Sequence, residues 1–188
     1  MKKIVFFFGA VLLCAPAAQA AQMSNPFMGY ADHQVGVYMA QGVDSGFLVP
    51  PPTRLVPFYM LQIQYSQPTT FFKIPARQSL NFGETIGLGS KYHWQWDKYS
   101  IPMLFASEDL ALMHGDCWYF SVGAGVGFQA QQNDRIGSKL LFQFKVAGGW
   151  RLTDTWAMEI YTQHFSNGNT APENNSYGFY GVGMTYSF

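Results

Sequence analysis

The chain has 188 residues, of which 18% are aromatic and only 12% are charged, about half the charged share of an ordinary globular protein. Its 11 basic and 11 acidic residues balance, which argues against a nucleic-acid-binding protein, because such proteins carry a basic excess. No run of about 18 apolar residues, the length of a spanning helix, follows the N-terminal segment. An apolar, aromatic chain without such a run fits a membrane β-barrel, whose strands alternate in polarity.

The N-terminal segment predicts a cleaved secretory signal. Two lysines precede the apolar stretch 4–13, and small residues follow at 18–20, which is the order of charge, apolar core and cleavage site in such signals. The apolar stretch is too short to span a bilayer as a helix. We therefore expect residues 1–20 to be removed and the mature domain to comprise 21–188.

Removal of the signal changes the charge and the cysteine content. Loss of Lys2 and Lys3 from the 11 basic residues leaves 9 against 11 acidic residues, a net charge of −2. Loss of Cys14 leaves Cys117 as the only cysteine, so we expect no intramolecular disulfide.

Alternating segments predict eight antiparallel strands that close into a transmembrane β-barrel, an all-β fold. One face of each strand must meet lipid and the other the lumen, so apolar and polar residues should alternate. The expected strands are 34–41, 58–65, 80–92, 99–105, 119–128, 138–150, 155–166 and 180–188. Eight is an even count, as bacterial outer-membrane barrels require.

Polar and proline-containing segments are expected to connect these strands. Pro50-Pro51-Pro52 and Gln67-Pro68-Thr69 are predicted to interrupt strands, 131–135 to form a polar hairpin and 151–154 a short turn. The segment 107–115 is compatible with one helical turn or with a long loop.

A soluble sandwich or lipocalin-like barrel would also alternate, with its apolar face turned inward. Low charge and aromatic richness favour the membrane. The chain also ends on the aromatic residue Phe188, as outer-membrane barrels commonly do. We therefore expect a barrel in a bacterial outer membrane.

A histidine and a serine share the outward parity of the strand 155–166. The earlier residues of this parity are apolar, so His164 and Ser166 should face the lipid near one rim. Residues two apart on a strand stand about 6.5 Å apart, a gap that an imidazole and a hydroxyl can bridge. Acyl transfer needs such a pair, because a serine hydroxyl is a poor nucleophile until a base accepts its proton. A rim histidine that only meets head groups is the structural alternative.

The segment His164-Phe165-Ser166-Asn167-Gly168, in the next-to-last strand of a signal-bearing barrel, resembles the active-site segment of the lipid A 3-O-deacylase (PagL) family. The likeness extends over 119–128, 134–137, 145–152 and the final strand, roughly the C-terminal half. The N-terminal half matches only in layout. The resemblance implies a carboxylic ester hydrolase that removes the 3-O-linked hydroxyacyl chain of lipid A with a Ser-His-Glu triad on the outer barrel face.

The resemblance also implies the role of each residue. Ser166 would be the nucleophile and His164 the general base, while Asn167 and Gly168 would contact the oxyanion or the substrate. No metal or organic cofactor is implied. The implied partners are lipid A, or lipopolysaccharide, and the surrounding membrane lipids, with no nucleic acid. The sequence leaves the oligomeric state open, a homodimer included.

The acidic member of the triad departs from the family pattern. The family's glutamate lies near the start of the last strand, where this chain has Ser176 and Gly178. Glu173 is the only acidic residue between Ser166 and the C-terminus, which makes it the candidate. The alternatives are a neutral hydrogen bond from 174–176 or an impaired enzyme.

Two other functions fit a small outer-membrane barrel. A non-catalytic barrel that stiffens the membrane or binds a partner through its loops would need neither Ser166 nor His164. An outer-membrane palmitoyl transferase also uses a serine and a histidine. That family carries an N-terminal amphipathic helix, and none is evident after Ala20.

Overall fold

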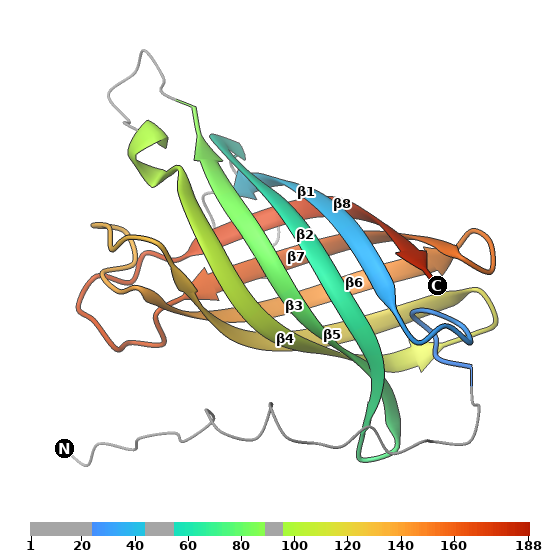
Figure 1. The fold of residues 1–188 in the computed structure, drawn as a ribbon. Coiled ribbons are helices and arrows are strands. Elements are labelled where there is room, and N and C mark those ends of the chain that lie inside the picture. The colour runs from blue at the N-terminus through green and yellow to red at the C-terminus, as the bar shows by residue number, and fades with distance from the viewer. Residues whose placement is uncertain (1–23, 44–54, 89–95) are drawn as a thin grey trace.

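The protein, seen in a computed structural model that describes residues 24–43, 55–88 and 96–188, is a closed barrel of eight antiparallel strands (Figure 1). Each strand pairs with its neighbours in the sequence, and β8 closes the barrel by pairing with β1. The strands are β1 (Gln34–Val43), β2 (Leu55–Phe71), β3 (Ile74–Gly87), β4 (Ile101–His114), β5 (Trp118–Gln129), β6 (Leu140–Arg151), β7 (Trp156–Ser166) and β8 (Tyr177–Ser187). A short 3-10 helix, η1 (Trp96–Tyr99), precedes β4. The predicted all-β, eight-stranded barrel is confirmed.

The strand register makes the barrel narrow. Paired residues followed from Gln34 through each strand in turn lead to Tyr177, the neighbour of Gly178, which pairs with Val43. One circuit therefore advances about ten residues along β1, and strands in such a barrel tilt by about 40° from the axis. The lumen of a barrel this size is just wide enough for side chains to fill.

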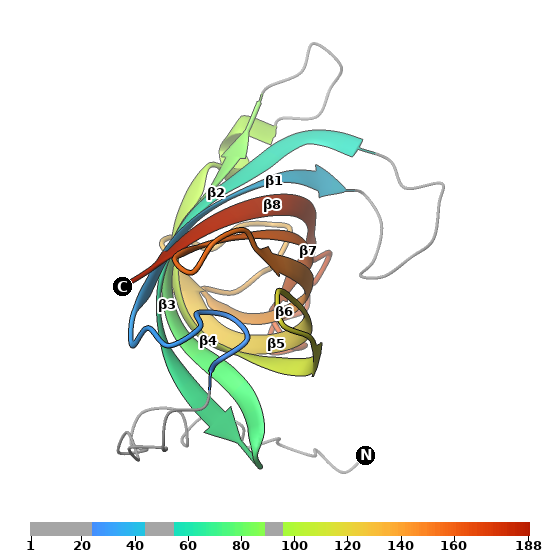
Figure 2. The same cartoon turned by 90° about the vertical axis from the view of Figure 1, so that its right-hand side faces the viewer.

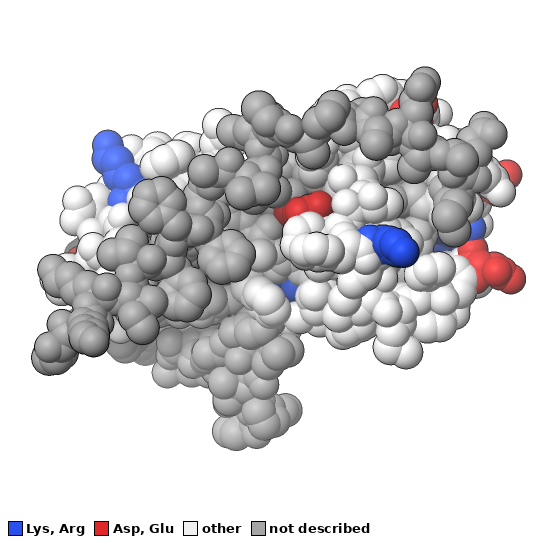
Figure 3. Space-filling model, turned by 90° about the horizontal axis from the view of Figure 1, so that it is seen from below, with Lys and Arg blue, Asp and Glu red and all other residues white. Residues whose placement is uncertain are grey.

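Polarity divides the barrel wall into two faces. The lumen side holds buried polar residues, among them Gln62, Gln64, Asn81 and Ser107. The outer side exposes large apolar residues on every strand, for example Val37, Leu61, Phe82, Leu104, Phe128, Phe144, Ile160 and Val182. Figure 3 shows few charged atoms among the described atoms of one face. Apolar residues outside and polar residues inside are the arrangement of a barrel that crosses a membrane. Within the described ranges, no helix is long and apolar enough to cross one.

Connections of different length mark the two ends of the barrel. One end carries the short turns after β2, β4 and β6, and the other carries longer connections such as 130–139 and 167–176. In outer-membrane barrels the short turns are periplasmic and the longer loops extracellular. The C-terminal end of β7 therefore lies on the extracellular side.

The segment that precedes β1 closes the periplasmic end (blue in Figure 2). Phe27 and Met28 are buried and pack against Ala111 and Tyr119. The side-chain amide of Asn25 donates a hydrogen bond of 2.8 Å to the carbonyl oxygen of Ala76. These contacts fill the lumen at this end with side chains from outside the strands.

Four charged side chains are buried together in the lumen. Arg77 of β3 binds Asp109 of β4 at 2.8 Å and Glu159 of β7 at 2.6 Å. Lys145 of β6 binds the other oxygen of Glu159 at 2.9 Å, and the Tyr119 hydroxyl donates to Glu159 at 2.6 Å. The two positive and two negative charges balance. Because buried charges are tolerated only when paired, this cluster links β3, β4, β6 and β7 across the lumen.

Three expectations for the N-terminal half were wrong. β2 continues through Gln67-Pro68-Thr69 instead of ending there, and β3 begins at Ile74. The first strand starts opposite Ser66, so β2 has a free edge beyond that residue. Proline is tolerated on such an edge because its missing N–H costs no ladder hydrogen bond.

The segment 107–115 is largely strand, since β4 runs to His114, and is neither a helical turn nor a loop. Asp109 points into the lumen, where Arg77 neutralises it, and the adjacent Glu108 faces outward. This acidic pair conceals the alternation in the sequence. The predicted signal, 1–20, and the predicted break at Pro50-Pro51-Pro52 lie outside the described residues.

Candidate active site

The outer face of β7 carries His164 and Ser166 at its extracellular end. Residues of the opposite parity, such as Gln163 and Phe165, are buried, whereas His164 and Ser166 are partly exposed. The structure therefore places both residues on one outward face, as the sequence predicts. Glu159 points into the lumen, so it lies on the wrong side of the wall to reach them.

The neighbouring strands put no carboxylate beside this pair. On β6, Phe144 pairs with His164 and Phe142 pairs with Ser166. On β8, the partner of His164 is Gly178. The histidine is thus flanked by an aromatic ring on one side and by a residue without a side chain on the other.

Asn167 organises the loop that follows Ser166. It is fully buried, and its Nδ2 donates to the carbonyl oxygens of Ile136 and, at 2.7 Å, of Glu173. Its Oδ1 accepts a hydrogen bond of 2.8 Å from the N–H of Asn169, and its own N–H donates to Oδ1 of Asn174 at 3.1 Å. The hydrogen-bonding groups of Asn167 are therefore engaged inside the loop.

Gly168 turns the chain away from the barrel wall. Its φ of +60° is a conformation that residues with a Cβ rarely adopt. A Cβ at this position would come within 2.8 Å of the Phe142 ring. Across the part of the chain that the structure describes, the loop's backbone hydrogen bonds do not include the Gly168 N–H. This N–H is a donor, close to Ser166, that the loop does not use.

Glu173 is exposed and lies against the β5–β6 loop. A Cβ built on Gly137 would stand 2.7 Å from Oε2 of Glu173 and 2.9 Å from its carbonyl oxygen. Among the described residues, no hydrogen bond or ion pair joins the Glu173 carboxylate to His164. The structure thus brings Ser166 and His164 together and puts Glu173 on a neighbouring loop.

The β5–β6 loop forms a support behind the β7–β8 loop. Nε of Arg135 donates to the carbonyl oxygen of Ser176 at 2.6 Å, and the N–H of Asn175 donates to the carbonyl oxygen of Arg135 at 2.7 Å. Asn133 sets the conformation of this loop, because its Oδ1 accepts hydrogen bonds of 2.9 Å from the N–H groups of Arg135 and Ile136. The sequence indicated only a polar hairpin here, although an Asn that caps the next two amides is a common turn signal.

A second link joins the β5–β6 loop to η1. Asp134 accepts hydrogen bonds from Nζ of Lys98 at 2.7 Å and from the Tyr99 hydroxyl at 2.9 Å. The bond from Lys98, followed by that from Tyr99, holds the pKa of the Asp134 carboxyl below its usual range. The ion pair is exposed, so it orders the two loops more than it stabilises the barrel.

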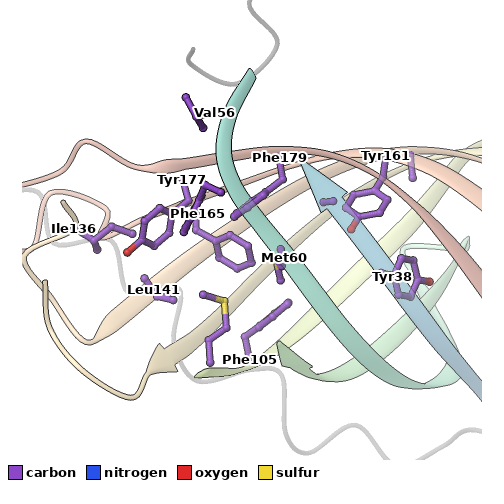
Figure 4. Close-up of a cluster of buried hydrophobic side chains, with 14 residues drawn as sticks. Tyr38, Val56, Met60, Phe105, Ile136, Leu141, Tyr161, Phe165, Tyr177 and Phe179 are labelled. Carbon is purple, nitrogen blue, oxygen red and sulfur yellow. The ribbon is translucent and has the colours of Figure 1, made fainter. Parts of the chain in front are cut away.

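A cluster of buried aromatic residues packs beneath the site, on the inner side of the wall (Figure 4). Phe165, between His164 and Ser166 in the sequence, packs edge-on against Phe105 with ring centroids 5.2 Å apart. Phe179 of β8 lies 6.3 Å from Phe165. These contacts hold the end of β7 in place from within, so the outward pair stands on a packed strand.

Comparison with known proteins identifies the family. A family model described as lipid A 3-O-deacylase (PagL) matches residues 87–187, more than half of the chain. The chain belongs to the PagL family. Its match includes β4 to β8 and therefore the whole of the site. The resemblance inferred from the sequence is confirmed, and so is a location in the bacterial outer membrane.

Solved structures agree with this PagL-family barrel at the level of the fold. Neisserial surface protein A aligns with a TM-score of 0.58 and 12% identity over 83% of this chain and 97% of its own. The outer membrane enzyme PagL aligns with a TM-score of 0.54 and 14% identity over 82% and 99%. The Yersinia pestis outer membrane protein Ail, solved in a phospholipid bilayer nanodisc, gives 0.52 and 10% over 84% and 99%. No match is found among curated proteins.

The β5–β6 loop of this PagL-family chain offers a test of the loop contacts. We expect Gly137→Ala to loosen the β7–β8 loop, because φ is +66° at this position and a Cβ would collide with Glu173. Strain of about 1–2 kcal/mol should raise the open population of the loop, and hence its cleavage by a protease, about five- to thirtyfold.

Limited proteolysis of the folded protein measures this rate at residues 167–176. Gly148→Ala is the matched control, since a Cβ there meets only the Trp150 ring at 3.7 Å. Equal cleavage of the two variants would show that the contact between Gly137 and Glu173 does not hold the loop. Within the described ranges, no three His, Cys, Asp or Glu side chains are placed to hold a metal ion.

Proposed function

We propose that this PagL-family barrel is an esterase that removes the 3-O-linked hydroxyacyl chain from lipid A, with Ser166 as nucleophile and His164 as general base. The observation that carries the proposal is the placement of both side chains on the outer face of β7 at its extracellular end. Lipid A occupies the outer leaflet, so its ester bonds lie at this depth and on this side of the wall.

The reaction divides into two acyl-transfer steps. His164 accepts the hydroxyl proton as Oγ of Ser166 attacks the ester carbonyl carbon, and then returns a proton to the departing sugar 3-hydroxyl. A water molecule, activated by the same imidazole, attacks the acyl-serine. Its hydrolysis releases the hydroxy fatty acid and regenerates the Ser166 hydroxyl.

The negative charge that develops on the carbonyl oxygen needs a hydrogen-bond donor in place. The N–H of Gly168 fills this role in our proposal, because the loop leaves it unused. Asn167 contributes by fixing the loop that presents this N–H, since its own amide groups are occupied. The oxyanion function expected of the Asn167-Gly168 pair is thereby divided between them.

Glu173 should matter less than a triad acid. In our proposal it supports the loop through its contact with Gly137, so Glu173→Ala should lower the deacylation rate by less than about tenfold. Loss of an acid that orients the imidazole costs about 10⁴-fold in a serine hydrolase. Rates of hydroxy fatty acid release from purified lipid A, with Glu173→Gln alongside, separate these cases. A loss approaching that of His164→Ala would assign Glu173 to the triad.

A non-catalytic barrel that acts structurally or binds a partner is the competing function, and the lack of a carboxylate in the paired positions beside His164 favours it. Mass spectrometry of lipid A from cells that produce the protein decides between the two. A deacylase removes the mass of one hydroxyacyl group, a structural barrel leaves lipid A unchanged, and an acyl transferase adds mass.

A further inference from the structure

The outer face below the site is a surface of bulky side chains with one interruption. On β6, the outward residues below Phe144 are Val146, Gly148 and Trp150. Gly148 pairs with Phe120 of β5 on one side and with Ile160 of β7 on the other. A glycine thus stands where its neighbours on both sides carry large apolar groups.

Neither the backbone nor the packing requires glycine at this position. Gly148 is not among the described glycines with positive φ, and a Cβ there would meet only the Trp150 ring, at 3.7 and 4.0 Å. The adjacent Gly149 differs, because a Cβ there would come within 2.1 Å of Tyr119. A glycine inside a strand costs about 0.5–1 kcal/mol relative to alanine. Gly148 bears this cost without a structural gain, which favours a role in ligand contact.

The position fits the far end of an acyl chain held at Ser166. Gly148 lies four residues along β6 from the partner of His164 and six from the partner of Ser166, or about 13 and 20 Å at the rise of a strand. With carbon–carbon bonds near 1.5 Å, an extended chain advances about 1.3 Å per bond. A chain of about ten to fifteen carbons therefore runs from the site to Gly148.

We propose that the gap at Gly148 receives the end of the acyl chain that is cleaved, so that residue 148 sets the longest chain the enzyme accepts. The inference rests on the proposed deacylase function. Ile160 forms one side of the gap, and the Trp150 ring forms its lower boundary because it is the nearest group to the missing side chain. The chain itself lies along the apolar outer face of β6 and β7.

The test measures kcat/KM of the purified full-length protein in mixed micelles on lipid A species whose 3-O-hydroxyacyl chains range from about ten to about fourteen carbons. Gly148→Leu fills the gap and should lower kcat/KM on the longest chain at least about tenfold relative to the shortest. Trp150→Ala removes the lower boundary and should shift the preference toward longer chains. Ala106→Leu adds similar bulk to the outer face of β4 and should leave the ratio unchanged.

The outcomes separate the two proposals. A wild-type protein that releases no hydroxy fatty acid from any chain overturns the deacylase function itself. An active wild type whose chain-length profile is the same in Gly148→Leu overturns only the role of Gly148. A uniform loss of rate on all chains in that variant also overturns it, since a length limit must discriminate. Heat-modified migration in gels verifies folding, and Gly148→Ala, which the structure accommodates, should show a smaller shift in the same direction.

Discussion

Ser166→Ala should lower the rate of hydroxyacyl release from lipid A by about 10⁴-fold or more without unfolding the barrel. The side chain faces outward and is partly exposed, so its loss leaves neither a cavity in the wall nor a buried polar group without a partner. The effect should therefore fall on chemistry and not on stability, which permits a clear reading of the rate.

The same experiment with His164→Ala and the double variant tests whether the two residues act as a unit. A nucleophile and its base give strongly non-additive effects, because either loss alone disables the attack. We expect the double variant to be about as slow as each single variant. Effects that multiply would mean that His164 and Ser166 act independently. Ser138→Ala, a serine change at the same end of the barrel, should keep the wild-type rate.

Glu159→Ala should destabilise the barrel by about 3–5 kcal/mol, because it leaves buried positive charge unpaired. Glu159 accepts hydrogen bonds from Arg77, Lys145 and Tyr119, and it is completely buried. With it gone, Asp109 alone faces two cations. Urea unfolding in lipid vesicles, followed by tryptophan fluorescence, measures the change in the free energy of unfolding.

Two companion variants test the explanation by charge balance. Lys145→Met combined with Glu159→Met removes one charge of each sign and leaves Arg77 paired with Asp109, so the double variant should be more stable than Glu159→Ala. Glu84→Gln changes an exposed glutamate on the outer face of β3 and should stay within about 0.5 kcal/mol of wild type. A Glu159→Ala protein as stable as Glu84→Gln would show that the cluster is not needed for folding.

The sequence predicts the fold best where each face of a strand keeps one chemical character. Along 119–128 and 155–166 the alternation is nearly complete, and the structure has β5 and β7 there. In 107–114 the inward Asp109 depends on Arg77, which is 32 residues away in the sequence. Local patterns do not show such a partner, so this stretch of β4 could not be distinguished from a loop.

The same division holds at the site. The shared face of His164 and Ser166 follows from their spacing on one strand, so the sequence predicts it. The surroundings of Asn167 and Glu173 depend on Ile136 and Gly137, which belong to a loop about thirty residues earlier. Loop-to-loop contacts of this kind arise only when the barrel closes and brings the two hairpins side by side.

The lumen is filled at both ends, by Phe27 and Met28 on the periplasmic side and by aromatic residues on the extracellular side, with charged side chains paired between them. A molecule cannot reach His164 and Ser166 through the barrel. A substrate of this face arrives sideways, by diffusion in the plane of the leaflet, and its encounter rate depends on its mole fraction in the membrane. Rates measured in detergent should therefore fall as micelles are added at constant substrate, since extra micelles dilute the substrate in the two dimensions in which it meets the enzyme.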